Sequence, residues 1–496
     1  MKANQFLGWS SALCLSAALA LPAQETISTN QLQQLQQQLR QLQQAFEQMQ
    51  SQYRQQIDGM QKQIDALQQA QSAAAEKKKL EDEIAAKLGT EAKPAASTPT
   101  TPVVEARKWS PSQPIPVMRT GSAYMNVSFD ALLNFGGSTA SDPSKELQLG
   151  DHDPIQRGFS LRNAELVFDG AVDPYFKGAA NLALKLDQNN ETELELEEAF
   201  LQTTALPANL QLKAGQFFAN FGRQNPQHPH QWALVDQPLV LNRAFGPDGL
   251  RNVGAQLSWL APLPFFTEAS LGFLNSGGGT AWSFRHRGED DGTGVERFVG
   301  RATLARGLRG PGDFLYVPRL ASSFDLTEQQ TLVVGLSGAF GPNDTGPRAR
   351  TEIYGADVYW KWKPANAQQG FPFVSWQTEA LWRRLDAGAD PTAVPALPAE
   401  RIVDYGFYSQ VLWGFKPRWV AGLRGEWATG NEAAYDASDV FRGERTRVSP
   451  VLTWYPSEFS KIRLQYNYDH GRRFGDEHSV WLQVEFLLGA HGAHKF

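Results

Sequence analysis

The chain has 496 residues, of which 42% are hydrophobic and 11% aromatic, and its formal net charge is -6. This length has room for two or three domains, and the acidic balance argues against a nucleic-acid partner. The single cysteine, Cys14, excludes a disulfide framework and a thiolate metal site.

Residues 1–23 are predicted to be a secretory signal peptide. Lys2 supplies a positive charge, an apolar run follows from Phe6 to Leu21, and Ala23 precedes the polar Gln24. This order is typical of a cleaved export signal, with a retained membrane anchor as the alternative. No later run reaches about 18 apolar residues, so the exported chain is expected to contain no membrane helix.

Residues 24–88 are predicted to form a helical segment with a coiled coil. Apolar residues recur at steps of three and four, with one additional step of four after Tyr53, which is the pattern of a heptad repeat with a stutter. A glutamine-rich disordered tract is the alternative interpretation. A coiled coil implies association of chains, and leucine at both core positions leaves the number of chains open.

Residues 89–117 are rich in proline, serine, threonine and alanine, which predicts a linker rather than a packed unit. The remaining residues, 118–496, are therefore expected to form the functional domain.

That domain consists of segments in which apolar and polar residues alternate. Ile462, Leu464 and Tyr466, for example, oppose Arg463 and Gln465, and a period of two places the two sets on opposite faces of a strand. About sixteen such segments are expected to begin near residues 118, 157, 173, 192, 208, 251, 265, 316, 331, 351, 372, 402, 418, 445, 460 and 478. This pattern predicts an all-β transmembrane antiparallel barrel of about 16 strands, which the coiled coil and the linker precede. A large soluble β-sandwich or propeller is the alternative.

A polar stretch over residues 222–250 interrupts the strands and is longer than a hairpin requires. A barrel of this size encloses an aqueous channel, and long loops are usually functional. We therefore expect this stretch to fold into the lumen as a constriction loop, and the alternative is an ordinary surface loop. The residues expected to constrict the channel are His228, His230, Trp232, Asp236 and Arg243.

Three segments carry a resemblance to a known family. They are NAELVFDGAVDPYFKGAANLAL, LEEAFLQTTALPANLQLKAGQFFANFGRQNPQHPHQW and LLGAHGAHKF, and with the coiled coil and linker they resemble the phosphate-selective porin family of Gram-negative outer membranes. The resemblance implies a trimer in outer-membrane lipid that allows passive diffusion of small solutes. It also implies selection of anions such as phosphate by a ladder of arginines, which this sequence does not reproduce as a whole.

Charged residues of both signs fall on the expected lumen face. Rings of basic groups select anions and acidic rings select cations, so the sequence favours anions only mildly. The basic residues expected to line the pore and set its selectivity are Lys213, Lys361, Lys363, Arg383, Arg424, Arg445, Arg447 and Arg463.

Two alternatives to a simple porin remain open. Neutral imidazole binds zinc, so His228 and His230 are weak candidates for a channel related to divalent metals, although no metal site and no cofactor are predicted. The second alternative is a structural barrel that the coiled coil tethers to the cell wall. The chain contains no hydrolase, metalloprotease, P-loop or dinucleotide motif, so no enzyme activity is expected.

Overall fold

A computed structural model gives the structure of the chain. It describes residues 113–147, 149–286, 288–290, 294–304, 306–434 and 439–489. The predicted signal peptide, the coiled coil, most of the linker and the terminal histidines lie outside the described residues.

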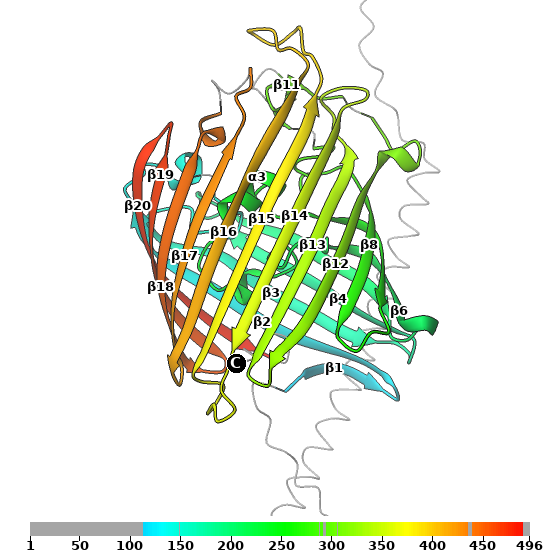
Figure 1. Cartoon of the computed structure of the whole chain (residues 1–496), viewed down its shortest axis with the longest axis vertical. Coiled ribbons are helices and arrows are strands. Elements are labelled where there is room, and N and C mark those ends of the chain that lie inside the picture. The colour runs from blue at the N-terminus through cyan, green and yellow to red at the C-terminus, as the bar shows by residue number, and fades with distance from the viewer. Residues whose placement is uncertain are drawn as a thin grey trace, which may run out of the picture. The chain divides into compact units, whose positions relative to one another are not determined.

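Sixteen antiparallel strands form one closed barrel (Figure 1). Each barrel strand pairs with the next in the chain, and β20 pairs with β2 to close the sheet, as in Leu133↔Val484. The fold class expected from the sequence is therefore confirmed. The strands are β2 (Ala123–Ser138), β3 (Gly158–Ala171), β4 (Phe176–Leu186), β5 (Thr192–Thr203), β6 (Leu210–Phe218), β7 (Arg251–Leu260), β8 (Thr267–Asn275), β12 (Phe314–Thr327), β13 (Gln330–Pro342), β14 (Arg350–Trp362), β15 (Phe373–Ala387), β16 (Glu400–Lys416), β17 (Trp419–Gly430), β18 (Arg445–Ser457), β19 (Ser460–Gly471) and β20 (Gly475–Leu488).

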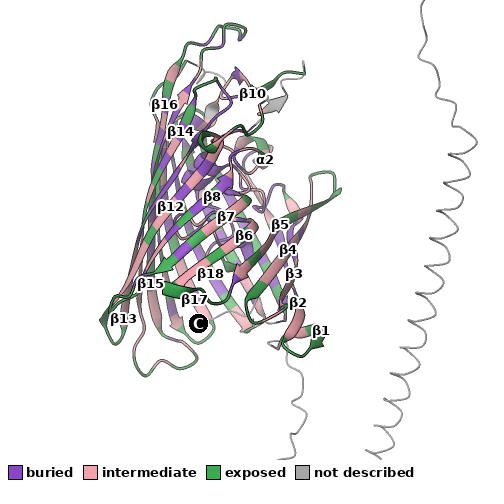
Figure 2. Cartoon of the chain, turned by 90° about the vertical axis from the view of Figure 1, so that its right-hand side faces the viewer, coloured by how far each residue is buried: buried purple, intermediate pink, exposed green. Residues whose placement is uncertain are grey.

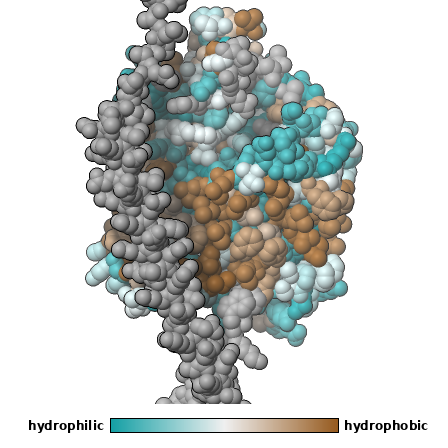
Figure 3. All heavy atoms as spheres, turned by 180° about the vertical axis from the view of Figure 1, so that it is seen from behind, coloured by the Kyte–Doolittle hydropathy of each residue, from teal (hydrophilic) through white to brown (hydrophobic). Residues whose placement is uncertain are grey.

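Apolar side chains point outward and polar side chains point inward along these strands. On β19, Leu464 is 50% exposed, whereas its neighbour Arg463 is 1% exposed, as the alternating burial colours of Figure 2 also show. In Figure 3, apolar atoms gather in a belt across the middle of the barrel, with hydrophilic atoms above and below it. This distribution reverses that of a soluble protein and suits a barrel surrounded by lipid.

The connections at the two ends of the barrel differ in length. Residues 172–175 join β3 to β4, and residues 328–329 join β12 to β13, whereas the opposite end carries residues 139–157, 219–250 and 276–313. These long connections contain α2 (Pro143–Glu146), η2 (Pro229–Gln231), α3 (Leu239–Phe245), η3 (Pro311–Asp313) and the small sheet of β9 (Glu289–Asp290), β10 (Glu296–Phe298) and β11 (Arg301–Ala302).

Three shorter elements complete the fold. They are η1 (Pro207–Asn209), η4 (Val440–Arg442) and β1 (Ile115–Thr120). β1 forms a hairpin with the start of β2, and it begins within the segment predicted to be linker. Within the described ranges, no helix is both long and apolar enough to span a bilayer.

Two of the register shifts in the barrel bring neighbouring side chains to its inner face. Between β4 and β5, Asn181 pairs with Glu198, whereas the next residue, Leu182, pairs with Leu196. Glu197 is therefore an additional residue on β5. A bulge of this kind turns adjacent side chains to one face. Both Glu197 and Glu198 consequently face the lumen, and on β3 a second register shift does the same for Arg162 and Asn163.

Candidate functional site

The segment 219–250, called the lumen loop below, connects β6 to β7 and is packed inside the barrel. All five residues expected to constrict the channel are buried, with exposures of 4% for His228, 3% for His230, 7% for Trp232, 2% for Asp236 and 4% for Arg243. Every residue of α3 is buried as well. The side chains of α3 pack into an apolar cluster with wall residues such as Phe217, Leu274 and Ile353, so the loop has its own hydrophobic anchor.

The loop first crosses to the wall formed by β13 and β15. The backbone N–H of Gly222 donates to Ser337 Oγ at 3.0 Å, and the N–H groups of Arg223 and Gln224 donate to Glu379 Oε1 at 3.1 and 2.7 Å. Gly222 has φ +61, and a Cβ there would lie 2.2 Å from a carboxylate oxygen of Glu379. Glycine is required at this turn because only glycine combines that backbone conformation with so close an approach.

Asp236 binds the opposite wall. Its carboxylate accepts hydrogen bonds from Arg447 Nη1 at 3.2 Å, Gln465 Nε2 at 2.9 Å and Asn467 Nδ2 at 2.7 Å, and it also pairs with Arg424. Burial favours the neutral acid, but the charges of Arg424 and Arg447 lower the pKa of Asp236 below its ordinary value. The carboxylate is therefore held ionised, in a network that satisfies it from three strands.

Two further cations of the wall bind carbonyl groups of the same loop. Arg463 donates from Nη2 to the carbonyl of Trp232 at 2.8 Å and from Nη1 to that of Leu234 at 2.9 Å. Lys461 Nζ donates to the carbonyl of His230 at 2.7 Å. These contacts fix the backbone of the loop against β19.

The eight basic residues predicted to line the pore all lie on the inner face, but they fall into two groups. The five arginines are buried and paired: Arg383 with Asp404, Arg424 with Asp236 and Glu426, Arg445 and Arg447 with Asp469, and Arg463 with the loop carbonyls. The three lysines, Lys213, Lys361 and Lys363, are only partly buried. The arginines thus hold the loops in place, and the lysines remain accessible to water.

One open part of the lumen lies beside β5 to β8. A cavity of about 230 Å³ is bordered there by Lys213, Asn220, Gln256 and Glu268. Lys213 Nζ lies 3.4 Å from Glu198 Oε1 and 3.7 Å from the centroid of the Phe200 ring. Solutes that share this space meet one lysine and one or two carboxylates.

A cluster of histidines and carboxylates joins the loop to β2, β3 and β5. His228 Nδ1 lies 3.0 Å from Glu197 Oε2, and His228 Nε2 lies 3.1 Å from Glu198 Oε2. His152 Nε2 lies 2.9 Å from Glu197 Oε1, and its Nδ1 lies 2.9 Å from the carbonyl oxygen of Arg162. The ring of His152 thus lies between a carbonyl oxygen and a carboxylate, and this environment favours its imidazolium form.

The charges of these neighbours also set the pKa values of the histidines. Burial alone would lower the pKa of His152, but the hydrogen bond and charge of Glu197 raise it to about 9. Burial also acts to lower the pKa values of His228 and His230. The charge of Glu165 outweighs this effect, so both pKa values lie above the ordinary value. The neighbouring carboxylates therefore favour the charged form of all three rings.

The same atoms have spacings that suit a metal ion. His228 Nδ1 lies 3.6 Å from Glu165 Oε2 and 3.0 Å from Glu197 Oε2, and His230 Nδ1 lies 3.4 Å from both Glu165 Oε2 and Asp130 Oδ2. Neighbouring ligand atoms of a tetrahedral zinc ion with bonds of about 2.1 Å lie about 3.4 Å apart. Within the described ranges, three such groups occur: Asp130–Glu165–His230, Glu165–Glu197–His228 and Asp151–His152–Glu195.

The sequence singled out His228 and His230 but missed their partners. Asp130 and Glu165 lie on strands far from the loop in the chain, and the bulge that turns Glu198 inward leaves no mark in the alternation. His152 lies in the connection 139–157, and its proximity to Glu197 depends on the closed barrel. The available signal was the acidic run Glu193–Glu198 on a strand adjacent to the loop.

No family model matches the chain, so membership of the phosphate-selective porin family stays a prediction. An uncharacterised protein of Aquifex aeolicus is 32% identical over 356 residues, which are 69% of this chain and 71% of that protein. Among solved structures, the chain is similar to the anion-selective porin from Comamonas acidovorans, with 7% identity, TM-score 0.46 and coverage of 74% of this chain and 100% of that one. It is also similar to Salmonella typhi OmpF in complex with daunomycin, with 9% identity, TM-score 0.43 and coverage of 74% of this chain and 98% of that one. The corresponding values for Pseudomonas putida OprB are 9% identity, TM-score 0.42 and coverage of 74% and 94%.

Proposed function

The chain belongs to the same protein family as the uncharacterised Aquifex aeolicus protein, and we propose that it forms an outer-membrane porin for passive diffusion of small solutes. The observation that carries the proposal is the combination of a lipid-facing apolar belt with a polar lumen crossed by an ordered loop. A barrel of sixteen strands leaves an aqueous channel unless something fills it. The lumen loop does not fill the whole lumen, and an open space remains beside β5 to β8, next to Lys213 and Asn220.

This path can be tested by cysteine accessibility, because Cys14 is the only cysteine and lies in the predicted signal peptide. Asn220→Cys places a thiol beside the cavity, and a charged methanethiosulfonate reagent is expected to reduce the current through single channels in a planar bilayer. Leu464→Cys is the matched control, since that side chain faces outward and is 50% exposed. An Asn220→Cys current that the reagent leaves unchanged would place the conduction path elsewhere.

The proposal also includes location in a Gram-negative outer membrane after export by a cleaved signal peptide, and assembly as a homotrimer. It further includes a mild preference for anions. Since the five arginines are paired, the preference rests on Lys213, Lys361 and Lys363. Lys361 and Lys363 border a separate cavity of about 400 Å³ with Gln329 and Thr331. Partly exposed lysines attract anions, but Lys213 already pairs with Glu198 at 3.4 Å, so Lys361 and Lys363 contribute most to this preference.

The histidine–carboxylate cluster supports a second candidate function, a channel related to divalent metals. Histidine and carboxylate ligands suit zinc, and here they would also join the lumen loop to the wall. The purified protein incubated with zinc and then desalted should retain metal by elemental analysis, and Glu197→Gln, which removes a ligand from the group with Glu165 and His228, should retain less. Glu193→Gln is the control, because Glu193 lies on the same strand and outside the three groups. Equal zinc retention by the wild type and both variants would exclude the group that contains Glu197, and a wild type that retains no zinc would exclude this candidate function.

A further inference from the structure

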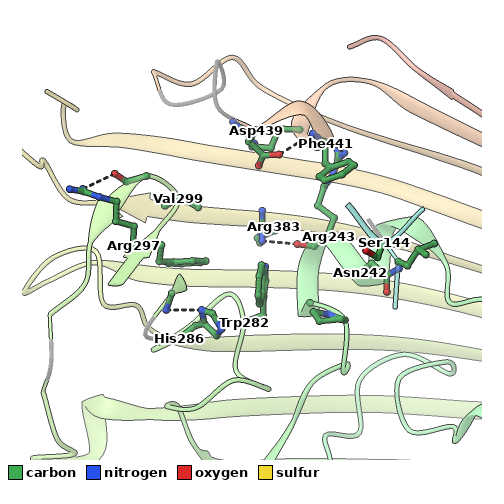
Figure 4. Close-up of a pocket in the computed structure, with 17 residues that line it drawn as sticks. Ser144, Asn242, Arg243, Trp282, His286, Arg297, Val299, Arg383, Asp439 and Phe441 are labelled. Carbon is green, nitrogen blue, oxygen red and sulfur yellow. Dashed lines mark hydrogen bonds between the residues drawn. The ribbon is translucent and has the colours of Figure 1, made fainter. Parts of the chain in front are cut away.

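A third cavity lies where the lumen loop meets the long connections 276–313 and 431–444. It is a cavity of about 450 Å³, and α3, Trp282, Phe298 and Phe441 form parts of its lining (Figure 4). Small-molecule sites usually have volumes of about 300–1,000 Å³ and combine apolar walls with a few convergent polar groups. This cavity has both properties.

Its charges are unequal. Among the described residues, the cavity is lined by one acidic residue, Asp439, and by four arginines, Arg243, Arg297, Arg383 and Arg442. Carboxylates behind the lining compensate three of the arginines: Asp404 pairs with Arg383 at 2.5 Å and with Arg442 at 3.1 Å, and Asp390 pairs with Arg297 at 3.1 Å.

Arg243 is the exception. Its Nη2 donates to the backbone carbonyls of Phe441 and, at 3.3 Å, Gly443, which carry no formal charge. Its buried Nη1 has no hydrogen bond to any described residue. Burial lowers the pKa of Arg243 to about 10; the charges of Arg445 and Arg383 act in the same direction, and those of Asp404 and Asp439 oppose them without pairing directly with the guanidinium. A buried cation with a spare donor is costly unless an anion completes it.

Aromatic rings form another part of the lining. The ring centroids of Trp282 and His286 lie 4.6 Å apart, and those of His286 and Phe298 lie 6.0 Å apart. Trp282 and His286 lie together on one side of the cavity in Figure 4, and Arg243 and Phe441 lie on another. Aromatic walls of this kind favour a planar apolar body over a hydrated inorganic ion.

We propose that this cavity binds a small organic monoanion, a carboxylate on an aromatic body, with the carboxylate at Arg243 and the ring against Trp282 and Phe441. The inference rests on the proposed channel function and names a solute class for it. Inorganic phosphate fits less well, because it would leave the aromatic surfaces exposed and would bring a second charge that the cavity does not balance.

The test uses benzoate as the probe, with the purified full-length protein in detergent and isothermal titration calorimetry. Wild type should bind benzoate more tightly than acetate, inorganic phosphate or benzylamine. Arg243→Gln should weaken benzoate binding by at least about tenfold, because a charge-assisted hydrogen bond is lost. Arg401→Gln is the control, because that arginine is exposed and lies outside the cavity.

Trp282→Leu provides a second variant in case Arg243→Gln does not fold. It should weaken benzoate binding and leave acetate binding unchanged. The inference is overturned if wild type prefers phosphate or benzylamine, or if both cavity variants bind benzoate as wild type does. Conductance in potassium chloride is measured separately. A protein that conducts without binding benzoate overturns only this inference, and a protein that binds benzoate without conducting overturns only the proposed channel.

Discussion

His228 Nδ1 of the lumen loop lies 3.0 Å from Glu197 Oε2 of β5. The other oxygen of the same carboxylate lies 2.9 Å from His152 Nε2, in the connection 139–157. One buried wall residue therefore holds two segments that are far apart in the chain. Glu197 is the additional residue of a bulge, and the positive charges of the two rings stabilise its buried carboxylate.

Replacement of Glu197 by glutamine should destabilise the packed lumen loop. The substitution keeps the shape but removes the charge between two buried imidazolium rings, which should cost about 3–5 kcal/mol. The expected result is a lower urea midpoint and faster proteolysis of residues 219–250. Glu193→Gln, on the same strand but about half exposed, should differ little from wild type. Equal proteolysis of the two variants would mean that the contacts of Glu197 do not hold the loop.

The pH dependence of stability should follow His152. Its folded pKa is raised from 6.5 to about 9, so its contribution is fully present below about pH 6.5 and is lost as the pH rises through about 9. A shift of this size corresponds to about 3 kcal/mol. The urea midpoint of wild type should fall toward that of His152→Gln between pH 6.5 and 9.5. Parallel curves for the two proteins would contradict an imidazolium at this position.

The barrel could be predicted from the sequence because its signal is local. Alternation such as Ile462–Arg463–Leu464 fixes the face of each side chain, and the strand starts expected near residues 192, 251 and 445 coincide with Thr192, Arg251 and Arg445. The path of the lumen loop could not be predicted, because each of its anchors depends on closure of the barrel. Asp236 was predicted to lie in the constriction loop, but its partners Arg447 and Gln465 become neighbours only after β18 and β19 have paired.

The bulge on β5 explains why the sequence pattern did not identify Glu198 as a partner of His228. A period of two assigns Glu198 to the lipid face, whereas the register shift on β5 turns it toward His228. The role of the arginines was also hidden, since the sequence shows that Arg424 and Arg463 face inward but not that loop groups meet them there. An inward-facing cation was therefore interpreted as a selectivity residue when its contacts are to the loop.

The homotrimer stays a prediction, because the heptads of residues 24–88 lie outside the described residues. Chemical crosslinking or native mass measurement in detergent should show three chains. Deletion of residues 24–110 should leave each barrel folded, because the expected linker separates the two parts and β1 begins only at Ile115. A monomer with residues 24–70 intact would contradict the role assigned to the coiled coil.

Selectivity should depend on the accessible lysines more than on the buried arginines. Lys361→Gln combined with Lys363→Gln removes two partly exposed charges beside a cavity, and the reversal potential under a salt gradient should shift toward cations. Arg447→Ala removes a partner from both Asp236 and Asp469. Its main effect should therefore be a loosened lumen loop, which is measured as a changed or noisier single-channel conductance.

Comparison of the lysine variant with the arginine variants separates residues that set selectivity from residues that hold the lumen loop. The reversal potential alone does not distinguish these two roles. An arginine that only holds the loop alters conductance first, because Asp236 is left with an unbalanced buried charge and the loop moves away from β18. An arginine that sets selectivity shifts the reversal potential at unchanged conductance. If Arg445→Ala, Arg447→Ala and Arg463→Ala together shift selectivity as far as the lysine variant while conductance stays at the wild-type value, the arginines line the path. If wild type prefers cations, the carboxylates around Glu197 govern the channel, and the divalent-metal function is favoured over anion diffusion.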